Sequence, residues 1–249
     1  MIPFKRSIAS LVHATLRRFG VDCHKVTPGT CHFMRLRRLC ERLGTTVVFD
    51  IGANEGQFAH GLLASGFRGR VISVEPGTEA HGGLVRAAAG HSRWIVASRC
   101  AVGAAAGTAE LNIAGNSVSS SLRPMLDAHQ SADPRSTYVR TETCDVVTMA
   151  DLFSRYVQAS DKGVFMKADV QGHESEVLRG AAEVLPRIDA IQLEMSLIPL
   201  YEGESEFVDQ VVAMKSMGYV LWQLEPGFLD ERVGRLLQVD GTFVRENRN

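Results

Sequence analysis

The chain has 249 residues, of which 45% are hydrophobic, enough to bury one sizeable core in a single α/β domain. Its formal net charge of −1 excludes a protein that binds nucleic acid by overall electrostatic attraction. The five cysteines lack a Cys-x-x-Cys spacing and indicate reduced thiols rather than a disulfide scaffold. No apolar run reaches the roughly 18 residues of a membrane span, and the basic start lacks a clear signal-peptide cleavage site. We therefore expect a cytoplasmic protein.

Positive charge is concentrated near the N-terminus. Residues 1–42 contain nine Lys or Arg against two acidic residues, a local balance of +7. Apolar residues within 2–19 fall near helical spacing and predict a basic amphipathic helix. We expect this helix to pack on the following domain; the alternative is contact with an anionic membrane surface or a lipid-linked substrate. A second helix is predicted over His32–Leu43 with Gly44 as its cap, so that residues 1–44 form a helical N-terminal extension.

Two pairs of neighbouring cysteine and histidine residues lie in this extension, Cys23-His24 and Cys31-His32. In zinc sites the ligands are separated along the chain so that their side chains converge on one ion. Adjacent residues do not meet that requirement, and we predict no metal site at either pair.

The stretch from Val47 to Phe58 is the most informative part of the sequence. Apolar residues run into a turn with Gly52 and Gly56, and a helical pattern follows. A strand, a glycine turn and a helix start together offer backbone amides to a nucleotide-like ligand. Glycine allows a close approach of backbone to ligand that a side chain would block. The pattern Asp-x-Gly-x-x-x-Gly, beginning at Asp50, lacks the middle glycine of a dinucleotide site and favours a smaller cofactor.

A second predicted strand, residues 70–75, ends in Glu75 and is closed by Pro76. An acidic residue at the end of the second strand binds ribose hydroxyls in doubly wound folds. Alone, Glu75 would be explained as a solvated strand end. Together with the glycine turn at this spacing, it predicts a nucleoside-binding site.

The rest of the chain alternates between strand and helix patterns. Such alternation predicts a mostly parallel sheet covered by helices, with ligands at the carboxyl ends of the strands. We expect a Rossmann-like α/β fold with a seven-stranded, mostly parallel sheet that is closed by an antiparallel strand. The predicted strands after residue 75 are 94–96, 107–113, 141–147, 163–170, 190–195, 219–224 and 242–244, and the predicted helices end near Ala64 and Ala89 or span 149–156, 174–185 and 207–217.

Residues 115–135 interrupt this alternation with a run rich in Ser, Asn, Asp and Pro. We expect a long loop with little packing of its own, because long loops in compact domains are usually functional or disordered. The segment is either a lid on the acceptor side of the site or a disordered insert, and the sequence does not separate the two.

Acidic residues stand at the predicted ends of four strands: Asp50, Glu75, Asp169 and Glu194. Because the carboxyl ends of parallel strands meet at one rim, we expect these four to surround the ligand crevice. Asp50 is expected to order the glycine turn and to reach an amino group of the cofactor through water.

Four segments together resemble the FkbM family of S-adenosylmethionine-dependent methyltransferases. The most specific is the Lys-x-Asp-x-x-Gly-x-Glu block at 167–174, since the glycine turn alone fits any class I methyltransferase. The resemblance covers about residues 45–245. It implies a methyltransferase domain over 45–249 that methylates a hydroxyl, often of a sugar or a polyketide-type product. The four segments are 50–58, 74–76, 146–152 and 165–174.

The resemblance implies that S-adenosylmethionine binds over the glycine turn and the second strand. Ala101 and Val102 lie where this fold places groups near the adenine, although a buried strand end would explain them equally well. The residues expected to bind the cofactor are Asp50, Gly52, Asn54, Gly56, Phe58, Glu75, Pro76, Ala101, Val102 and Asp169.

Methyl transfer to a hydroxyl needs an oxygen in line with the methyl and a group that takes the proton. Asp169 and His173 are the candidates, because the strand end and the following turn overhang the methyl. His173 has the more suitable ordinary pKa, whereas Asp169 belongs to the block shared with the family. Glu194 is a third catalytic candidate. Glu174 either caps the following helix or, with Asp169 and Glu194, holds a Mg²⁺ ion.

We therefore expect an O-methyltransferase that acts on a hydroxyl of a sugar, a glycolipid or a related natural product. The alternatives are a non-catalytic S-adenosylmethionine-binding module and a methyltransferase for a non-sugar small molecule. Methylation of nitrogen or of nucleic acid is disfavoured, because no Asn/Asp-Pro-Pro-Tyr-like block is present. The basic N-terminal helix slightly favours a lipid-linked acceptor and a location beside the inner membrane face.

Overall fold

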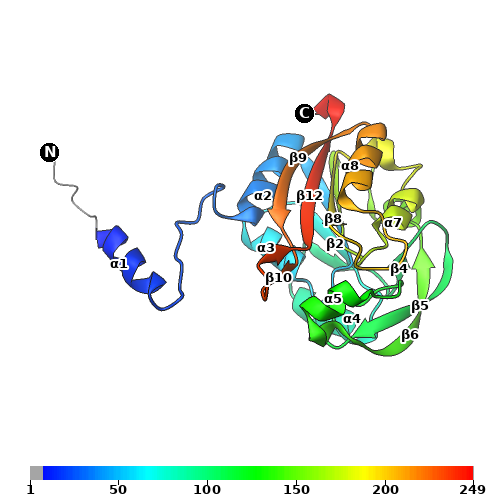
Figure 1. The fold of residues 1–249 in the computed structure, drawn as a ribbon. Coiled ribbons are helices and arrows are strands. Elements are labelled where there is room, and N and C mark those ends of the chain that lie inside the picture. Colours follow the sequence, from blue (N-terminus) through cyan, green and yellow to red (C-terminus); the bar gives the residue numbers. More distant parts are fainter. Residues whose placement is uncertain (1–7, 249) are drawn as a thin grey trace.

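The computed structural model describes residues 8–248, which are built around a seven-stranded sheet (Figure 1). The strands are β1 (Thr45–Ile51), β2 (Arg70–Val74), β3 (Trp94–Val96), β7 (Gly163–Ala168), β8 (Ala190–Ser196), β9 (Tyr219–Pro226) and β12 (Gln238–Arg245). They lie in the order β3-β2-β1-β7-β8-β12-β9. The pairs from β3 to β8 are parallel, whereas β12 runs antiparallel to both of its neighbours. The predicted fold, a mostly parallel sheet closed by an antiparallel strand, is confirmed.

Two hydrophobic clusters cover the two faces of this sheet. Along β1 the side chains alternate between them: Val47, Phe49 and Ile51 join one cluster and Val48 joins the other. The alternation follows from the extended backbone, and it fixes which strand residues face which helices. The helices on the first face are α6 (Met149–Tyr156), α7 (Glu174–Gly180) and α8 (Phe207–Ser216), and those on the second are α2 (His32–Leu43), α3 (Gln57–Ala64) and α4 (Thr78–Ala88).

The helix α2 has the bounds predicted for it and packs as part of the domain. Its inward face buries Leu36, Leu39 and Leu43. Gly44 ends the helix with a left-handed φ of 66°, a conformation that glycine adopts without steric cost. These contacts place α2 over the second face of the sheet, with its first residues, His32 and Phe33, at the strand ends where a ligand is expected.

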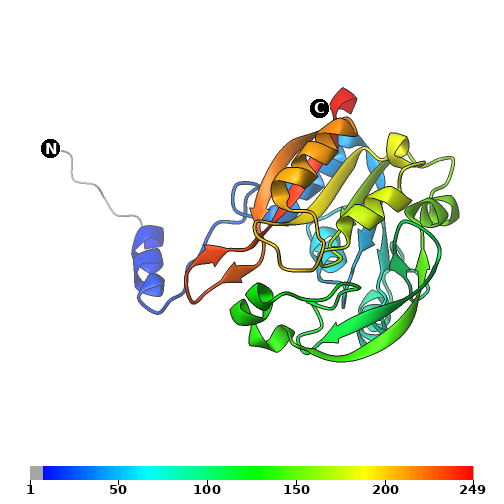
Figure 2. The same ribbon diagram turned by 45° about the vertical axis from the view of Figure 1, so that its right-hand side comes forward.

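The first helix, α1 (Ile8–Arg17), lies apart from the globular body in both views (Figures 1 and 2). The expectation that it packs on the domain is therefore not met. Residues 2–7 of the predicted helix lie outside the described residues. Beyond α1, Phe19 is 78% exposed. Within residues 8–248, no helix has both the length and the apolar character needed to cross a bilayer.

A smaller sheet stands beside the central one, and two of its strands are connected by the segment predicted to be a loop. Its order is β4-β6-β5, with β4 (Ala101–Val102), β5 (Gly107–Ala114) and β6 (Tyr138–Val147). Residues 115–135, between β5 and β6, are packed, contrary to our expectation. They contain α5 (Asp127–Ala132), and both Ser121 and His129 are buried.

The packing of this segment comes from distant parts of the chain. Ser121 pairs with Asn112 of β5 in a two-way backbone bridge, and Met125 bridges Tyr201. Ser121 also donates a hydrogen bond from Oγ to the carbonyl oxygen of Gln171 at 2.6 Å. Because Gln171 and Tyr201 lie far away in sequence, the polar composition alone suggested a loop.

Several elements differ from the predictions in their bounds or were not predicted. The helix α7 ends at Gly180 instead of Leu185, and a 3-10 turn over Leu185–Arg187 follows. Pro186 has no backbone N–H to donate, so the chain around it forms this separate 3-10 turn and does not continue α7. The strand β12 begins at Gln238, four residues earlier than predicted. The small hairpin β10 (Leu229–Asp230) and β11 (Arg235–Leu236), which follows β9, was not predicted.

Candidate active site

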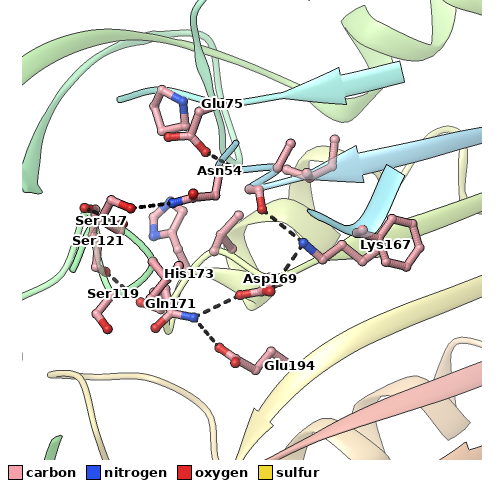
Figure 3. A pocket seen from close by; sticks show the side chains of 18 of the residues that line it. Asn54, Glu75, Ser117, Ser119, Ser121, Lys167, Asp169, Gln171, His173 and Glu194 are labelled. Atoms are coloured by element: carbon pink, nitrogen blue, oxygen red, sulfur yellow. Dashed lines mark hydrogen bonds and ion pairs between the residues drawn. The ribbon is translucent and has the colours of Figure 1, made fainter. Parts of the chain in front are cut away.

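A cavity of about 530 Å³ lies at the carboxyl ends of the parallel strands. One side is formed by the glycine turn and the end of β2, and the other by β8 and β12. Residues 116–122 reach across to the glycine turn, where Asn54 donates a hydrogen bond to Ser117 Oγ at 3.2 Å (Figure 3). Among the predicted site residues, Asp50 and Gly56 do not line the cavity. Those that line it are Gly52, Asn54, Phe58, Glu75, Pro76, Ala101, Val102, Asp169, His173 and Glu194.

The two predicted glycines act in different ways. Gly52 has a left-handed φ of 74°, and a Cβ atom there would overlap the carbonyl oxygen of Asp169. Gly52 therefore allows the turn after β1 to lie directly against the end of β7. Gly56 has a φ of 94°, and its missing side chain leaves room for the ring of Trp94. Gly56 thus serves the packing of α3 and not the cavity, which corrects its predicted role.

Glu75 lies at the end of β2 and is almost entirely buried, yet it lines the cavity. Its Oε2 accepts a hydrogen bond from the backbone N–H of Asn54, and its Oε1 accepts one from Gly77, both at 2.8 Å. Burial raises the pKa of Glu75, and these two hydrogen bonds oppose the shift. A carboxylate has about four acceptor positions, so two are left for the hydroxyls of a ribose.

Asp50 is fully buried beneath the cavity. Ser73 donates to its Oδ2 at 3.1 Å, and Lys167 lies 3.2 Å from its Oδ1. The predicted contact of Asp50 with a cofactor is therefore not available, because its carboxylate is enclosed between β2 and β7. Its other predicted role, to order the glycine turn, is carried out through Lys167, which donates to the carbonyl oxygen of Gly52 at 3.0 Å.

Lys167 ties Asp50 to Asp169, whose Oδ2 lies 3.3 Å from the ammonium group (Figure 3). Burial alone would lower the pKa of Lys167, but Asp169 and Asp50 outweigh it and raise the pKa above its ordinary value. The lysine is therefore a permanent cation between two acids. It fixes the carboxylate of Asp169, which is one-third exposed, at the floor of the cavity.

Gln171 was missed in the sequence and occupies the centre of the site. Its side-chain amide donates to Asp169 Oδ1 at 2.9 Å and to Glu194 Oε2 at 2.6 Å (Figure 3). Its Oε1 accepts a hydrogen bond from the hydroxyl of Tyr201 at 2.6 Å. The φ of Gln171 is 56°, an uncommon value for a residue other than glycine. That left-handed turn directs the amide between the two acids.

The two candidates that follow in the turn, His173 and Glu174, have different surroundings. His173 lines the cavity, and its Nδ1 is buried without a hydrogen-bond partner. Burial, Arg123 and Arg179 lower the pKa of His173 to about 4, so its ring is neutral near pH 7. Glu174 is buried and accepts a hydrogen bond from the backbone N–H of Val170 at 2.9 Å.

These contacts leave no metal site among the three acids considered for Mg²⁺. The carboxylate of Glu174 closes the turn from Val170, and the amide of Gln171 lies between Asp169 and Glu194 where a cation would have to bind. Within residues 8–248, no group of three or more His, Cys, Asp or Glu side chains is arranged to hold a metal ion.

Other polar residues of the cavity were also missed. Gln192, Gln238 and Asp240 line it from β8 and β12. Gln238 and Asp240 alternate with core residues in the sequence, a pattern that would have revealed them if β12 had been predicted to begin at Gln238.

The sequence profile of the family described as "Methyltransferase FkbM domain" matches residues 50–221, which include the glycine turn, Glu75 and the 167–174 block. The chain belongs to the FkbM methyltransferase family. Membership confirms the resemblance and identifies S-adenosylmethionine as the cofactor. The match ends before β12, so Asp240 lies outside the region that the profile covers.

The fold of this FkbM methyltransferase is distantly similar to solved methyltransferases. Synechocystis magnesium protoporphyrin IX methyltransferase with bound S-adenosylmethionine is 11% identical, with 98% of this chain and 100% of that chain covered and a TM-score of 0.46. A putative RNA methyltransferase from Pyrococcus horikoshii is 15% identical, with 86% and 81% covered and a TM-score of 0.42. These similarities are too low to indicate a substrate. No curated protein matches the chain at a significant level.

The cavity of the FkbM domain fits its cofactor. The acceptor positions of Glu75 suit two ribose hydroxyls, and Ala101 and Val102 supply an apolar wall beside it. The close approach of Gly52 to Asp169 brings the end of β1 against the end of β7, so that the cavity continues from the nucleoside side to the catalytic candidates.

Proposed function

We propose that this protein is an O-methyltransferase that methylates a hydroxyl of a sugar or of a glycolipid. The observation that carries the proposal is the cavity itself. It joins an acid suited to ribose, Glu75, to a cluster of carboxylates and amides suited to a hydroxyl-rich acceptor. Residues 116–122 add to this polar lining, and among them Ser117 accepts a hydrogen bond from Asn54 of the glycine turn at 3.2 Å (Figure 3).

Asp169 is proposed to take the proton of the acceptor hydroxyl. Bound S-adenosylmethionine supplies an electrophilic methyl group on sulfur. The carboxylate of Asp169 is held by Lys167 and Gln171 and is still partly exposed, so it retains free acceptor positions toward the cavity. Orientation of the hydroxyl oxygen toward the methyl provides most of the acceleration, and proton removal adds about 10² to 10⁴-fold.

His173 is proposed to help orient the acceptor. Its ring is neutral near pH 7, and its unpartnered Nδ1 can accept or donate one hydrogen bond according to the tautomer. Glu194, held by Gln171, is proposed to bind a second polar group of the same acceptor. The acidic lining and the net charge of −1 disfavour a nucleic acid, whose phosphates would be repelled.

The N-terminal segment is proposed to hold the protein near an anionic membrane surface. Support comes from the +7 balance of residues 1–42 and from two exposed apolar residues, Val12 in α1 and Phe19 just after it. Flotation with anionic and with neutral lipid vesicles tests this point. We expect binding to the anionic vesicles only and its loss after deletion of residues 1–26; equal binding of the shortened protein would overturn the proposal.

Calorimetric titration with S-adenosylhomocysteine tests the site. We expect micromolar affinity, roughly −8 kcal/mol, with no change on addition of Mg²⁺. The alternative of a non-catalytic binding module predicts the same binding but no methyl transfer to any hydroxyl. Absence of binding would overturn the proposed function as a whole.

A further inference from the structure

The face of β8 and β12 that borders the cavity is polar over three successive cross-strand pairs and apolar at the pair Ala190 and Val244. Residues directly opposite in an antiparallel pair share one face, and Glu194 is paired with Asp240. The neighbouring residues along each strand, among them Leu193 and Val239, point to the other face and belong to the hydrophobic core there. The polar face consists of Gln192, Glu194 and Ser196 on β8 and of Gln238, Asp240 and Thr242 on β12.

The hydrogen-bond donors of this face are already engaged. The amides of Gln238 and Gln171 both donate to Glu194 Oε2, at 2.9 and 2.6 Å. The Oε1 of Gln192 is an acceptor that has no hydrogen-bond partner, although Gln192 lines the cavity and is only 2% exposed. Buried polar atoms are normally satisfied. The groups left for a ligand are therefore acceptors: Glu194 Oε1, Gln192 Oε1 and the carboxylate of Asp240, which accepts one hydrogen bond from the side chain of Gln192.

Neither of these two acids belongs to an ion pair in the described residues. The nearby Lys167 opposes, through space, the raised pKa of both, but its own ion pairs are with Asp50 and Asp169, at 3.2 and 3.3 Å. Glu225, the partner of Asp240 on β9, is paired with Arg35. Within residues 8–248, no Lys, Arg or His forms an ion pair with Glu194 or Asp240. Burial and neighbouring carboxylates raise the pKa of both, that of Asp240 to about 6. Burial of a carboxylate that is not in an ion pair costs free energy, and a cationic group of a ligand would offset that cost.

This acidic pair lies far from the ribose end of the cavity. Glu75 ends β2, and β8 and β12 are three and four strands away in the sheet. At ~4.8 Å between neighbouring strands, the separations are roughly 14 and 19 Å. Asp169, at the end of β7, lies between the two ends. Seen from the ribose end, the acidic pair therefore lies beyond Asp169, on the side of the cavity where the methyl-accepting substrate is proposed to bind.

We propose that the acceptor carries a protonated amine, as in an amino sugar or an amino polyol, and that this ammonium group binds between Glu194 and Asp240. An ammonium has three N–H donors, and the site offers three matching acceptors with Gln192 Oε1 as the third. A hydroxyl of the same molecule then lies at Asp169. The inference rests on the proposed function for the transfer step, but the ammonium site itself is tested by binding alone.

The test is calorimetric titration of the full chain saturated with S-adenosylhomocysteine. The probes are matched pairs that differ in the amine: D-glucosamine against N-acetyl-D-glucosamine, and ethanolamine against ethylene glycol. We expect each amine to bind at least about tenfold more tightly than its neutral partner, equivalent to about 1.4 kcal/mol. Asp240→Asn and Glu194→Gln should remove that preference. Glu183→Gln, an exposed acid outside the cavity, is the matched control and should keep it.

Three results would overturn the ammonium site. The neutral probes could bind as well as the amines, the amines could fail to bind while S-adenosylhomocysteine binds, or Asp240→Asn could leave the preference unchanged. A loss of S-adenosylhomocysteine affinity in Asp240→Asn would instead assign the acids to the cofactor and also contradict the proposal. Failure of the wild-type protein to bind S-adenosylhomocysteine would count against the proposed function, so the two failures are distinguishable.

Discussion

The ammonium group of Lys167 lies 3.2 Å from the carboxylate of Asp50, which is completely buried. Removal of the lysine would leave an uncompensated buried charge, so Lys167→Met should destabilise the fold by about 3 to 5 kcal/mol. The double variant Lys167→Met/Asp50→Asn should recover part of this loss. Urea unfolding measures both, with the exposed Lys215→Met as control. A loss equal to that of the control would show that the pair is not stabilising.

Gly52 is predicted to be essential for the shape of the site, in contrast to Gly44. Both have positive φ, but a Cβ at Gly44 meets nothing within 4 Å, whereas one at Gly52 overlaps the carbonyl oxygen of Asp169. Gly44→Ala should cost about 1 to 2 kcal/mol of stability, the penalty of the left-handed backbone alone. Gly52→Ala should cost more and also weaken S-adenosylhomocysteine binding. Equal stability and affinity in the two variants would contradict this difference.

Glu75→Ala should weaken S-adenosylhomocysteine binding. The substitution removes a charged acceptor of hydrogen bonds, worth roughly 1.5 to 3 kcal/mol, so the dissociation constant should rise about 10 to 100-fold. Glu79→Ala, a nearby acid with an exposed side chain, should bind as the wild type does. Circular dichroism verifies that both variants are folded. Unchanged affinity in folded Glu75→Ala would remove the ribose assignment.

Asp169→Asn should keep cofactor affinity within about threefold and lower kcat by about 10² to 10⁴-fold, the range of general-base catalysis. The substitution keeps the shape of the side chain and its hydrogen bond with Gln171. His173→Gln should lower kcat less, because the histidine is assigned to orientation and not to proton removal. If His173→Gln were the slower of the two, the roles would have to be exchanged.

Glu174 should make stability depend on pH. Burial raises its pKa in the folded protein to about 8, above the ordinary value of 4.5. The folded state therefore holds the proton more tightly, and this contribution to stability is present below pH 4.5 and is lost as pH rises toward 8. Glu174→Gln should gain on the order of 2 kcal/mol relative to wild type between about pH 5 and about pH 8. Urea midpoints that shift in parallel for both proteins would contradict the raised pKa.

The central fold was predictable because its signals are local. The glycine turn, the alternation along β1 and the cap at Gly44 each depend on residues close together in sequence. The positions of Glu75 and Asp169 at the ends of the two strands that flank β1 followed from the parallel order. These features identified the strand ends at which the cavity lies.

The acceptor side was less predictable because its contacts are long-range. Asp240 meets Glu194 only because β12 inserts between β8 and β9, which no local pattern indicates. The packing of Ser121 depends on Gln171, fifty positions away. Asp50 was misplaced for a related reason: its position in the strand predicts a rim residue, but Lys167 covers it from the adjacent strand.

Methyl transfer from S-adenosylmethionine labelled with ¹³C in its methyl group tests the central claim most directly. The wild type and Asp169→Asn would be incubated with methyl glycosides of hexoses, 6-deoxyhexoses and 2-amino-2-deoxyhexoses, and the products analysed by ¹H–¹³C NMR. We predict a labelled methoxy carbon on at least one glycoside with the wild type and its loss with Asp169→Asn. Label on nitrogen, or no labelled methoxy product from a protein that binds S-adenosylhomocysteine, would contradict the account.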